Sequence, residues 1–154
     1  MKKNKFLFLL IITLSSCKSI PDFDYSKLTK TDTIYKLDLS NRSLRKQPNL
    51  SEFTIIDLNL SNNKISDFKE SFLPKGIQKL NLSNNKIKKF NCRKRIIQNI
   101  NLSSNKLTTV QMSLYEEIKA DTLNVANNKN LETQYWAFPK FYKTLINYTV
   151  TTKN

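Results

Sequence analysis

The chain of 154 residues contains no histidine, a single glycine and four prolines. Without histidine it lacks the side chain that most often serves as a general base or a metal ligand near neutral pH. The scarcity of glycine and proline is unlike a linker-rich or low-complexity segment. These shortages argue against Ser–His or Cys–His catalysis and favour one ordered domain, for which the chain has the usual length.

Long apolar runs are also missing. Phe6–Leu14 holds nine consecutive apolar or threonine residues, whereas a membrane-spanning helix needs about 20. The run follows the basic start MKKNK and ends in Leu14-Ser15-Ser16-Cys17. A basic start, a short apolar stretch and small residues are typical of a secretory signal peptide, so residues 1–16 are expected to be removed.

The LSSC stretch resembles the lipobox of bacterial lipoproteins. This resemblance implies cleavage after Ser16 and lipidation of Cys17, with acyl chains that hold the protein on a membrane without spanning it. Lys18 follows in place of aspartate, which favours the outer over the inner membrane of the bacterial cell envelope. The periplasmic or surface face stays open. An ordinary signal peptide with a chance cysteine is the alternative.

Acidic residues are few: 12 Asp and Glu stand against 26 Lys and Arg, a net charge of +14. Removal of residues 1–16 takes away three lysines and no acid, which leaves +11. Six Lys or Arg lie in the ten residues of Lys86–Arg95, KIKKFNCRKR. Without Cys17, only Cys92 remains as a thiol, and we expect it to be buried rather than reactive.

A repeated segment fills the middle of the chain. LNLSNNKI at Leu58–Ile65 returns unchanged at Leu80–Ile87, 22 residues later, and aligning on it gives units at 34–44, 55–65, 77–87, 97–107 and 120–131. Leu, Ile or Val at the fourth and sixth positions alternates with polar residues, which indicates a strand with one buried face. One unit cannot bury that face alone, so the units are expected to stack.

These units resemble leucine-rich repeats, whose signature is L-x-x-L-x-L-x-x-N-x-L. The resemblance implies an α/β solenoid, with a parallel sheet of about five strands on the concave face and turns or short 3-10 or helical segments on the convex face. Val110–Lys119 is expected to form one helical segment. Residues 17–33 would be the lipidated tether and N-terminal cap, 34–131 the five repeats and 132–154 the C-terminal cap. The aromatic residues of this cap could alternatively bind a ligand: Trp136, Phe138, Phe141 and Tyr142.

The ninth position of the units is asparagine in all but the first. There the chain must turn away from the strand, and a carboxamide can satisfy the backbone groups that the turn leaves unpaired. The resemblance implies a buried structural ladder formed by Asn63, Asn85, Asn105 and Asn128.

The third and fifth positions point away from the core and are the candidate ligand-facing residues. The third gives Lys36, Asp57, Lys79, Asn99 and Thr122, and the fifth gives Asp38, Asn59, Asn81, Asn101 and Asn124. Five strands about 4.8 Å apart make a strip only about 20 Å long. It would suit a peptide backbone or sugar hydroxyls; a solvated polar face with a surface charge ladder is the alternative. The tenth position adds a cationic row: Lys64, Lys86, Lys106 and Lys129.

Two functions remain. The first is an envelope lipoprotein whose repeats bind a protein or peptide ligand. The alternative is electrostatic binding of anionic lipid headgroups or acidic polymers such as polysaccharide, which are better partners for an exported basic protein than nucleic acid. The sequence shows no nucleophile–base pair, glycine-rich phosphate loop or metal-ligand spacing. We therefore expect neither an enzyme nor a cofactor or metal, and Asp38 and Asp57 should stay ionised beside Lys36 and Lys79.

Overall fold

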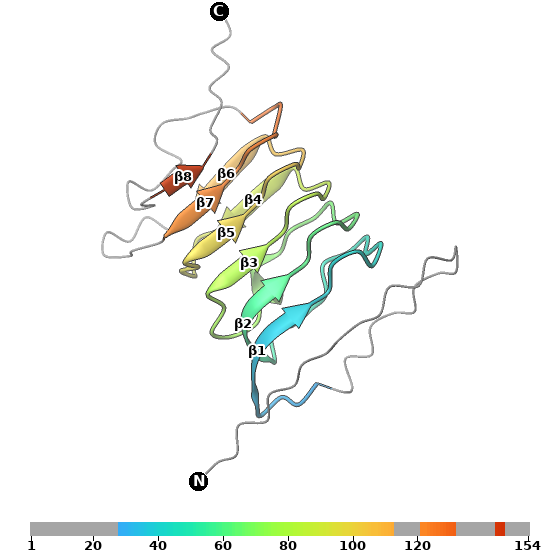
Figure 1. The fold of residues 1–154 in the computed structure, drawn as a ribbon, viewed down its shortest axis with the longest axis vertical. Helices are drawn as coiled ribbons and strands as arrows, with labels where there is room; N and C mark the ends of the chain where they lie inside the picture. Colours follow the sequence, from blue (N-terminus) through green and yellow to red (C-terminus); the bar gives the residue numbers. More distant parts are fainter. Residues whose placement is uncertain (1–27, 113–120, 132–143, 147–154) are drawn as a thin grey trace, which may run out of the picture.

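The computed structural model describes residues 28–112, 121–131 and 144–146. They form a solenoid in which each coil contributes one strand to a long parallel sheet (Figure 1). The strands lie in the order β1-β2-β3-β5-β7-β8. Their bounds are Thr33–Asp38 (β1), Thr54–Asn59 (β2), Lys79–Asn81 (β3), Asn99–Asn101 (β5), Thr122–Asn124 (β7) and Thr144–Ile146 (β8). The predicted solenoid with a parallel sheet is confirmed.

The strands of the main sheet pair at equivalent positions of the repeat. Leu58 pairs with Leu80, and Leu80 pairs with Ile100. The inter-coil hydrogen bonds continue past the strands, since Leu60 N donates to Asn81 O and Leu82 N to Asn101 O, each at 2.8 Å. The repeat period therefore sets both the register of the sheet and the stacking of the turns that follow it.

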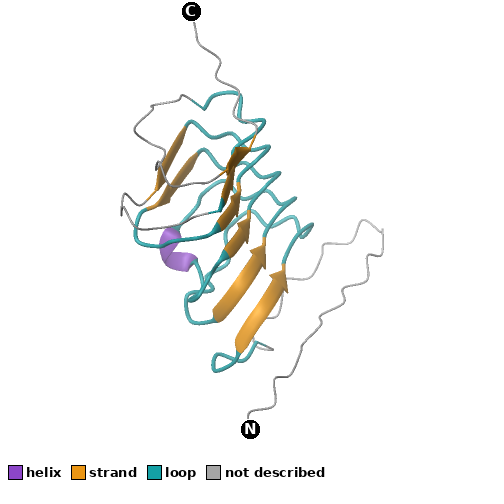
Figure 2. Ribbon diagram, turned by 60° about the vertical axis from the view of Figure 1, so that its left-hand side comes forward, coloured by secondary structure: helices purple, strands orange, loops and turns teal. Residues whose placement is uncertain are grey.

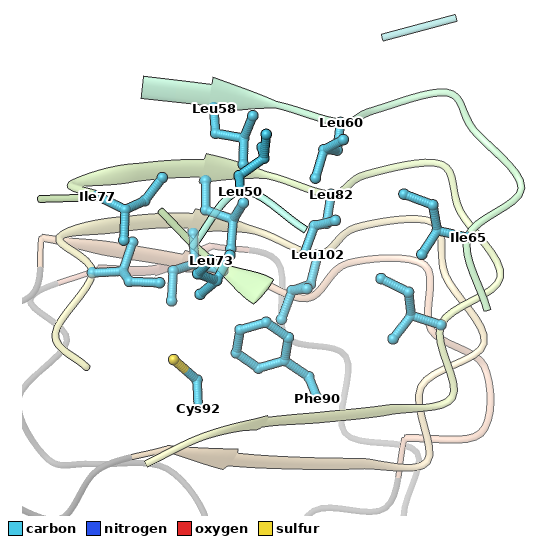
Figure 3. Close-up of a cluster of buried hydrophobic side chains, with 14 of the residues drawn as sticks. Leu50, Leu58, Leu60, Ile65, Leu73, Ile77, Leu82, Phe90, Cys92 and Leu102 are labelled. Atoms are coloured by element: carbon cyan, nitrogen blue, oxygen red, sulfur yellow. The ribbon is translucent and has the colours of Figure 1, made fainter. Parts of the chain in front are cut away.

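The core is a continuous column of aliphatic side chains under the main sheet. Leu60, Leu82 and Leu102 have no exposed surface, and Figure 3 shows them stacked one coil above another. They point toward Phe90 and Cys92, which are also buried. Burial of one such side chain contributes about 1.5–3 kcal/mol, so this column is the main source of stability.

The side of the coils opposite the main sheet differs from the expectation. Figure 2 shows strands there and one short helix. β4 (Lys89–Cys92) and β6 (Thr109–Met112) form a second, two-stranded parallel sheet, and the 3-10 helix η2 spans Glu70–Phe72. The α/β class is therefore wrong: the described chain is a β-solenoid with almost no helix. The predicted helix at Val110–Lys119 is also wrong for residues 110–112, which lie in β6, while 113–119 fall outside the described residues.

The short coils explain why strands replace helices. Each coil has only 20–23 residues for a strand, two turns and the return path. A helix rises about 1.5 Å per residue and a strand about 3.3 Å, so the few residues left cross the back of the coil only when extended. In β4, Lys89 and Asn91 are exposed while Phe90 and Cys92 are buried, which is the alternation of a strand.

The turn after each main strand uses a left-handed backbone conformation. Positive φ angles of 55–58° recur at the eighth position of each unit, and the first unit has a further one at Ser43. The eighth position is occupied by Asn41, Asn62, Asn84, Ser104 and Asn127. Asparagine tolerates this region better than most residues with a Cβ. The chain therefore repeats a glycine-type turn with almost no glycine, and its only glycine, Gly76, has a φ of 68° before β3.

The sheet has six strands instead of the expected five. β8 pairs in parallel with β7, Leu145 opposite Leu123. Its sequence, TLI, has isoleucine at the fifth position, where the repeat has asparagine or aspartate, so the pattern did not reveal it. Cys17 and the four aromatic residues of the C-terminal cap lie outside the described residues. None of the described segments forms a helix suited to crossing a membrane.

Candidate functional site

The candidate ligand-facing residues lie in two columns across the main sheet. Asp57 pairs with Lys36 on one side and with Lys79 on the other, followed by Asn99 and Thr122. The fifth-position column is equally aligned: Asp38, Asn59, Asn81, Asn101 and Asn124. All ten side chains are exposed or half-buried. The structure thus brings them together on one face, which we call the strip.

The oxygen atoms of the fifth-position column are already in use. Asn59, Asn81 and Asn101 each accept a hydrogen bond at Oδ1 from the backbone N–H two residues later, at 3.0–3.1 Å. Asp38 and Asn124 do the same for Ser40 and Ala126. This side-chain turn ends each strand and prepares the left-handed residue that follows. Sequence reasoning missed it, although the recurring Asn-Leu-Ser was a visible signal.

The turn fixes which atoms of the strip can meet a ligand. Because Oδ1 faces the backbone, the Nδ2 group of each asparagine is held on the other side of the carboxamide. Within the described residues, the Nδ2 groups of Asn81 and Asn101 have no acceptor, whereas that of Asn59 is directed to the Asp38 carboxylate. The middle of the strip therefore presents hydrogen-bond donors at half-buried side chains.

Asp38 stays ionised at one end of the strip. Partial burial alone would raise the pKa of its carboxyl, but hydrogen bonds from Ser40 and Asn59 and the nearby Lys36 outweigh that effect and hold the pKa below its usual value. In the third-position column, Lys36 and Lys79 flank Asp57 in register, so the charges alternate in sign. At the far end Thr122 Oγ1 donates to Asn99 Oδ1 at 2.8 Å.

The ninth-position asparagines link successive coils. Asn85 Oδ1 accepts from Ile65 N at 3.0 Å, and its Nδ2 donates to Leu60 O of the preceding coil and to Leu82 O of its own coil. Asn63, Asn105 and Asn128 make the equivalent bonds. The side chains of Asn63, Asn85 and Asn105 are buried, and that of Asn128 is half-buried. All four residues hold the coils together, and the three buried ones are inaccessible to a ligand.

The basic stretch Lys86–Arg95 has a structural use that the sequence did not show. After β4 the chain turns around one carboxylate: Glu70 accepts from Lys94 N at 2.7 Å and from Arg93 N at 3.1 Å. The Cys92 thiol lies 3.5 Å from Glu70 Oε1. Burial, and to a lesser degree this carboxylate, raises the pKa of Cys92, which keeps the thiol protonated. The expected burial of Cys92 is confirmed.

The tenth-position lysines lie beyond the ends of the strands. Lys64, Lys86, Lys106 and Lys129 are all exposed. They flank the turn that carries the asparagine ladder and are separate from the strip. Arg45 and Lys88, two residues further along their coils, are exposed as well. We call these six residues the basic flank.

Among the residues that the structure describes, no three His, Cys, Asp or Glu side chains gather as a metal site. A scan of the chain against protein-family models found no match, and searches of curated proteins and of solved structures found none either.

Proposed function

We propose that the chain is a lipid-anchored bacterial envelope protein whose leucine-rich repeats form an interaction module for a protein or peptide. The observation that carries this proposal is the strip: ten polar side chains in register on one exposed face, with carboxamide donors fixed at its centre. The repeat spacing of 20–23 residues and the asparagine ladder support the leucine-rich repeat assignment. LSSC at residues 14–17 supports the anchor.

The geometry of the strip favours a ligand rich in acceptor atoms. Nδ2 groups from neighbouring coils are spaced by the strand separation of about 4.8 Å. A peptide lying across the strands offers carbonyl oxygens along its length, and hydrogen bonds from side chains of known orientation cost less ordering than those from free side chains. Lys79 and Asp57 beside this column add charges of both signs, which favour a peptide over a purely anionic ligand.

Exchanging the carboxamide for a carboxylate tests the strip without disturbing the turn. Asn81→Asp and Asn101→Asp keep the Oδ1 acceptor, as Asp38 does at the same position, but remove the Nδ2 donor. Crosslinking on intact cells, followed by identification of the crosslinked protein, should recover a partner with the natural chain and not with the double variant.

Asn91→Asp is the matched control, because Asn91 is exposed on β4 of the second sheet. Crosslinking with the Asn91→Asp variant should still recover the partner. Recovery of the same partner at the same yield from Asn81→Asp/Asn101→Asp would refute binding at the strip. The anchor is tested separately, because Cys17→Ala should abolish incorporation of labelled fatty acid. Incorporation of the label into this variant would refute the lipobox assignment.

A second candidate function is diffuse electrostatic binding of anionic headgroups or acidic polymers. The excess of 11 positive charges that remains after removal of residues 1–16 favours it. Attraction of this kind is screened over about 8 Å at physiological salt, so binding should fall steeply as NaCl is added. Binding at the strip should persist in the same titration.

A further inference from the structure

Along the basic flank, exposed polar side chains lie on either side of a buried residue. In the second coil, Lys64 and Ser66 are exposed and Ile65 between them has no exposed surface. Lys86 N donates to Ile65 O at 2.8 Å, and Lys64 N to Leu44 O at 2.8 Å. These bonds place equivalent side chains of three successive coils next to one another.

A surface hollow of about 390 Å³ lies on this flank. It is lined by Arg45 from the first coil, Lys64 and Ser66 from the second and Lys86 from the third. Three cations and one serine thus lie around one hollow, and the described part of its lining contains no acid. Its volume falls within the range of small-molecule sites, about 300–1,000 Å³. We call it the groove.

The charges of the groove are not neutralised by described acids. The ion pairs of the described residues, Lys30–Glu52 and Lys69–Asp67, include none of its three cations. Asp67 follows Ser66 in sequence, but its carboxylate lies 4.0 Å from Lys69.

The third-position column of the strip shows the opposite arrangement. There Lys36, Asp57 and Lys79 alternate in sign from strand to strand. Like charges on adjacent strands repel one another, and alternation avoids this cost. The three cations of the groove still repel one another, and a bound anion would offset this repulsion by attracting each of them.

We propose that the groove binds a phosphate-type oxyanion. The planar guanidinium of Arg45 can donate two parallel hydrogen bonds to one such group, and Lys64 and Lys86 act as additional charged donors. The Ser66 hydroxyl supplies a neutral donor. The phosphate belongs either to a lipid headgroup or to a soluble phosphate ester. This site is distinct from the strip and does not depend on the peptide-binding proposal.

The first experiment titrates the full chain with inorganic phosphate at constant ionic strength and follows backbone amide signals by NMR. Saturable shifts are expected at Lys64, Ser66 and Lys86. Lys64→Gln/Lys86→Gln should weaken binding at least about tenfold, because each lost charge-assisted hydrogen bond costs about that factor. Lys64→Arg should bind like the natural chain, since it keeps the charge and donors.

Lys75→Gln is the control for charge loss away from the groove. It removes one positive charge, half of what the double variant removes, from an exposed residue that precedes β3, at the other end of the strands. It should bind phosphate as the natural chain does. Equal weakening by Lys75→Gln and by the double variant would overturn the proposal in favour of diffuse attraction. Absence of any saturable shift would overturn it as well.

The second experiment distinguishes the two sources of phosphate. The same proteins are sedimented with vesicles of phosphatidylglycerol and of phosphatidylcholine; all carry the same N-terminal segment, so its contribution cancels. A lipid headgroup is the ligand if the double variant alone loses binding to phosphatidylglycerol. A soluble phosphate ester is the ligand if vesicle binding is equal in all proteins while the phosphate shifts still depend on Lys64 and Lys86.

Discussion

At the scale of the residue, asparagine has three different roles within a single coil. Asn59 ends the strand by accepting a backbone hydrogen bond, Asn62 adopts the left-handed conformation, and Asn63 links the coil to its neighbour. Each role uses a different property of the side chain: the acceptor oxygen, tolerance of positive φ, and the combination of donors and acceptor. The three asparagines of the repeated NLSNN thus occupy three different structural positions.

Replacing a ladder residue should be costly. Asn85→Leu removes the acceptor for Ile65 N and leaves that N–H unpaired in the core, while Leu60 O keeps only its second hydrogen bond, from Asn63 Nδ2. We expect the free energy of unfolding to fall by about 2 kcal/mol or more. Urea denaturation measures this, with the exposed Asn91→Leu as the control. An unchanged midpoint for Asn85→Leu would contradict the role of the ladder.

Replacing the serine at the eighth position of the fourth unit should be beneficial. Ser104 has a φ of 55° where three of the other coils have asparagine directly after serine. Ser104→Asn should relieve backbone strain and raise the free energy of unfolding by up to about 1 kcal/mol. Ser104→Val should lower it, because a β-branched residue fits this region poorly. Thermal unfolding of the two variants tests the sign, and a stabilising valine would refute the argument.

At the scale of the element, the back of the solenoid depends on contacts between coils. Gln47, which is buried, exchanges two hydrogen bonds with the backbone of Lys69: Lys69 N donates to its Oε1 at 2.9 Å and its Nε2 donates to Lys69 O at 3.2 Å. The described part of the first coil has no strand on the side opposite the main sheet. There the Gln47 side chain makes the hydrogen bonds to the next coil that a strand would otherwise make. The stacked rings of Phe68 and Phe90, with centroids 4.3 Å apart, connect the next two coils.

The turn after β4 should depend on one carboxylate. Glu70→Gln replaces one of two acceptor oxygens with an amide group that faces the backbone N–H of Arg93 or Lys94. We expect the free energy of unfolding to fall by about 1–2 kcal/mol, with faster amide hydrogen exchange at residues 92–95. Glu52→Gln, which removes an exposed partner of Lys30, is the control and should change stability little. Equal effects of the two substitutions would contradict the special role of Glu70.

At the scale of the whole molecule, stability comes from neighbouring coils and is opposed by charge. Among the described residues, each main strand pairs only with the strands beside it in the sheet order, so each coil depends on its immediate neighbours for support. The net charge of +14 includes the rows of like charge on the basic flank. Such self-repulsion destabilises the folded state and is screened by salt.

Salt should therefore stabilise the protein. Raising NaCl from about 0.02 M to about 0.5 M shortens the screening length severalfold, and we expect the melting temperature to rise by about 2 °C or more. Lys64→Gln/Lys86→Gln should show a smaller rise, because two of the repelling charges are gone. A melting temperature that is constant or falls with NaCl would show that charge repulsion does not limit stability.

The sequence by itself determined the coil. The period of about 22 residues and the buried fourth and sixth positions predicted the solenoid, the parallel sheet and the pairing of Leu58 with Leu80. They could be predicted because alternation along a strand is a local property, and identical units bury their apolar faces only by stacking in register.

Only the tertiary structure decided what lies between the repeats and which polar atoms remain accessible. The back of the coil became a strand because of the distance it must cross, and β8 joined the sheet through a segment without the repeat pattern. The carboxamide oxygens of the strip turned inward to the backbone, while Arg45, Lys64 and Lys86 came together around one hollow. These outcomes depend on the spacing and orientation of neighbouring coils, which no single unit of the sequence encodes.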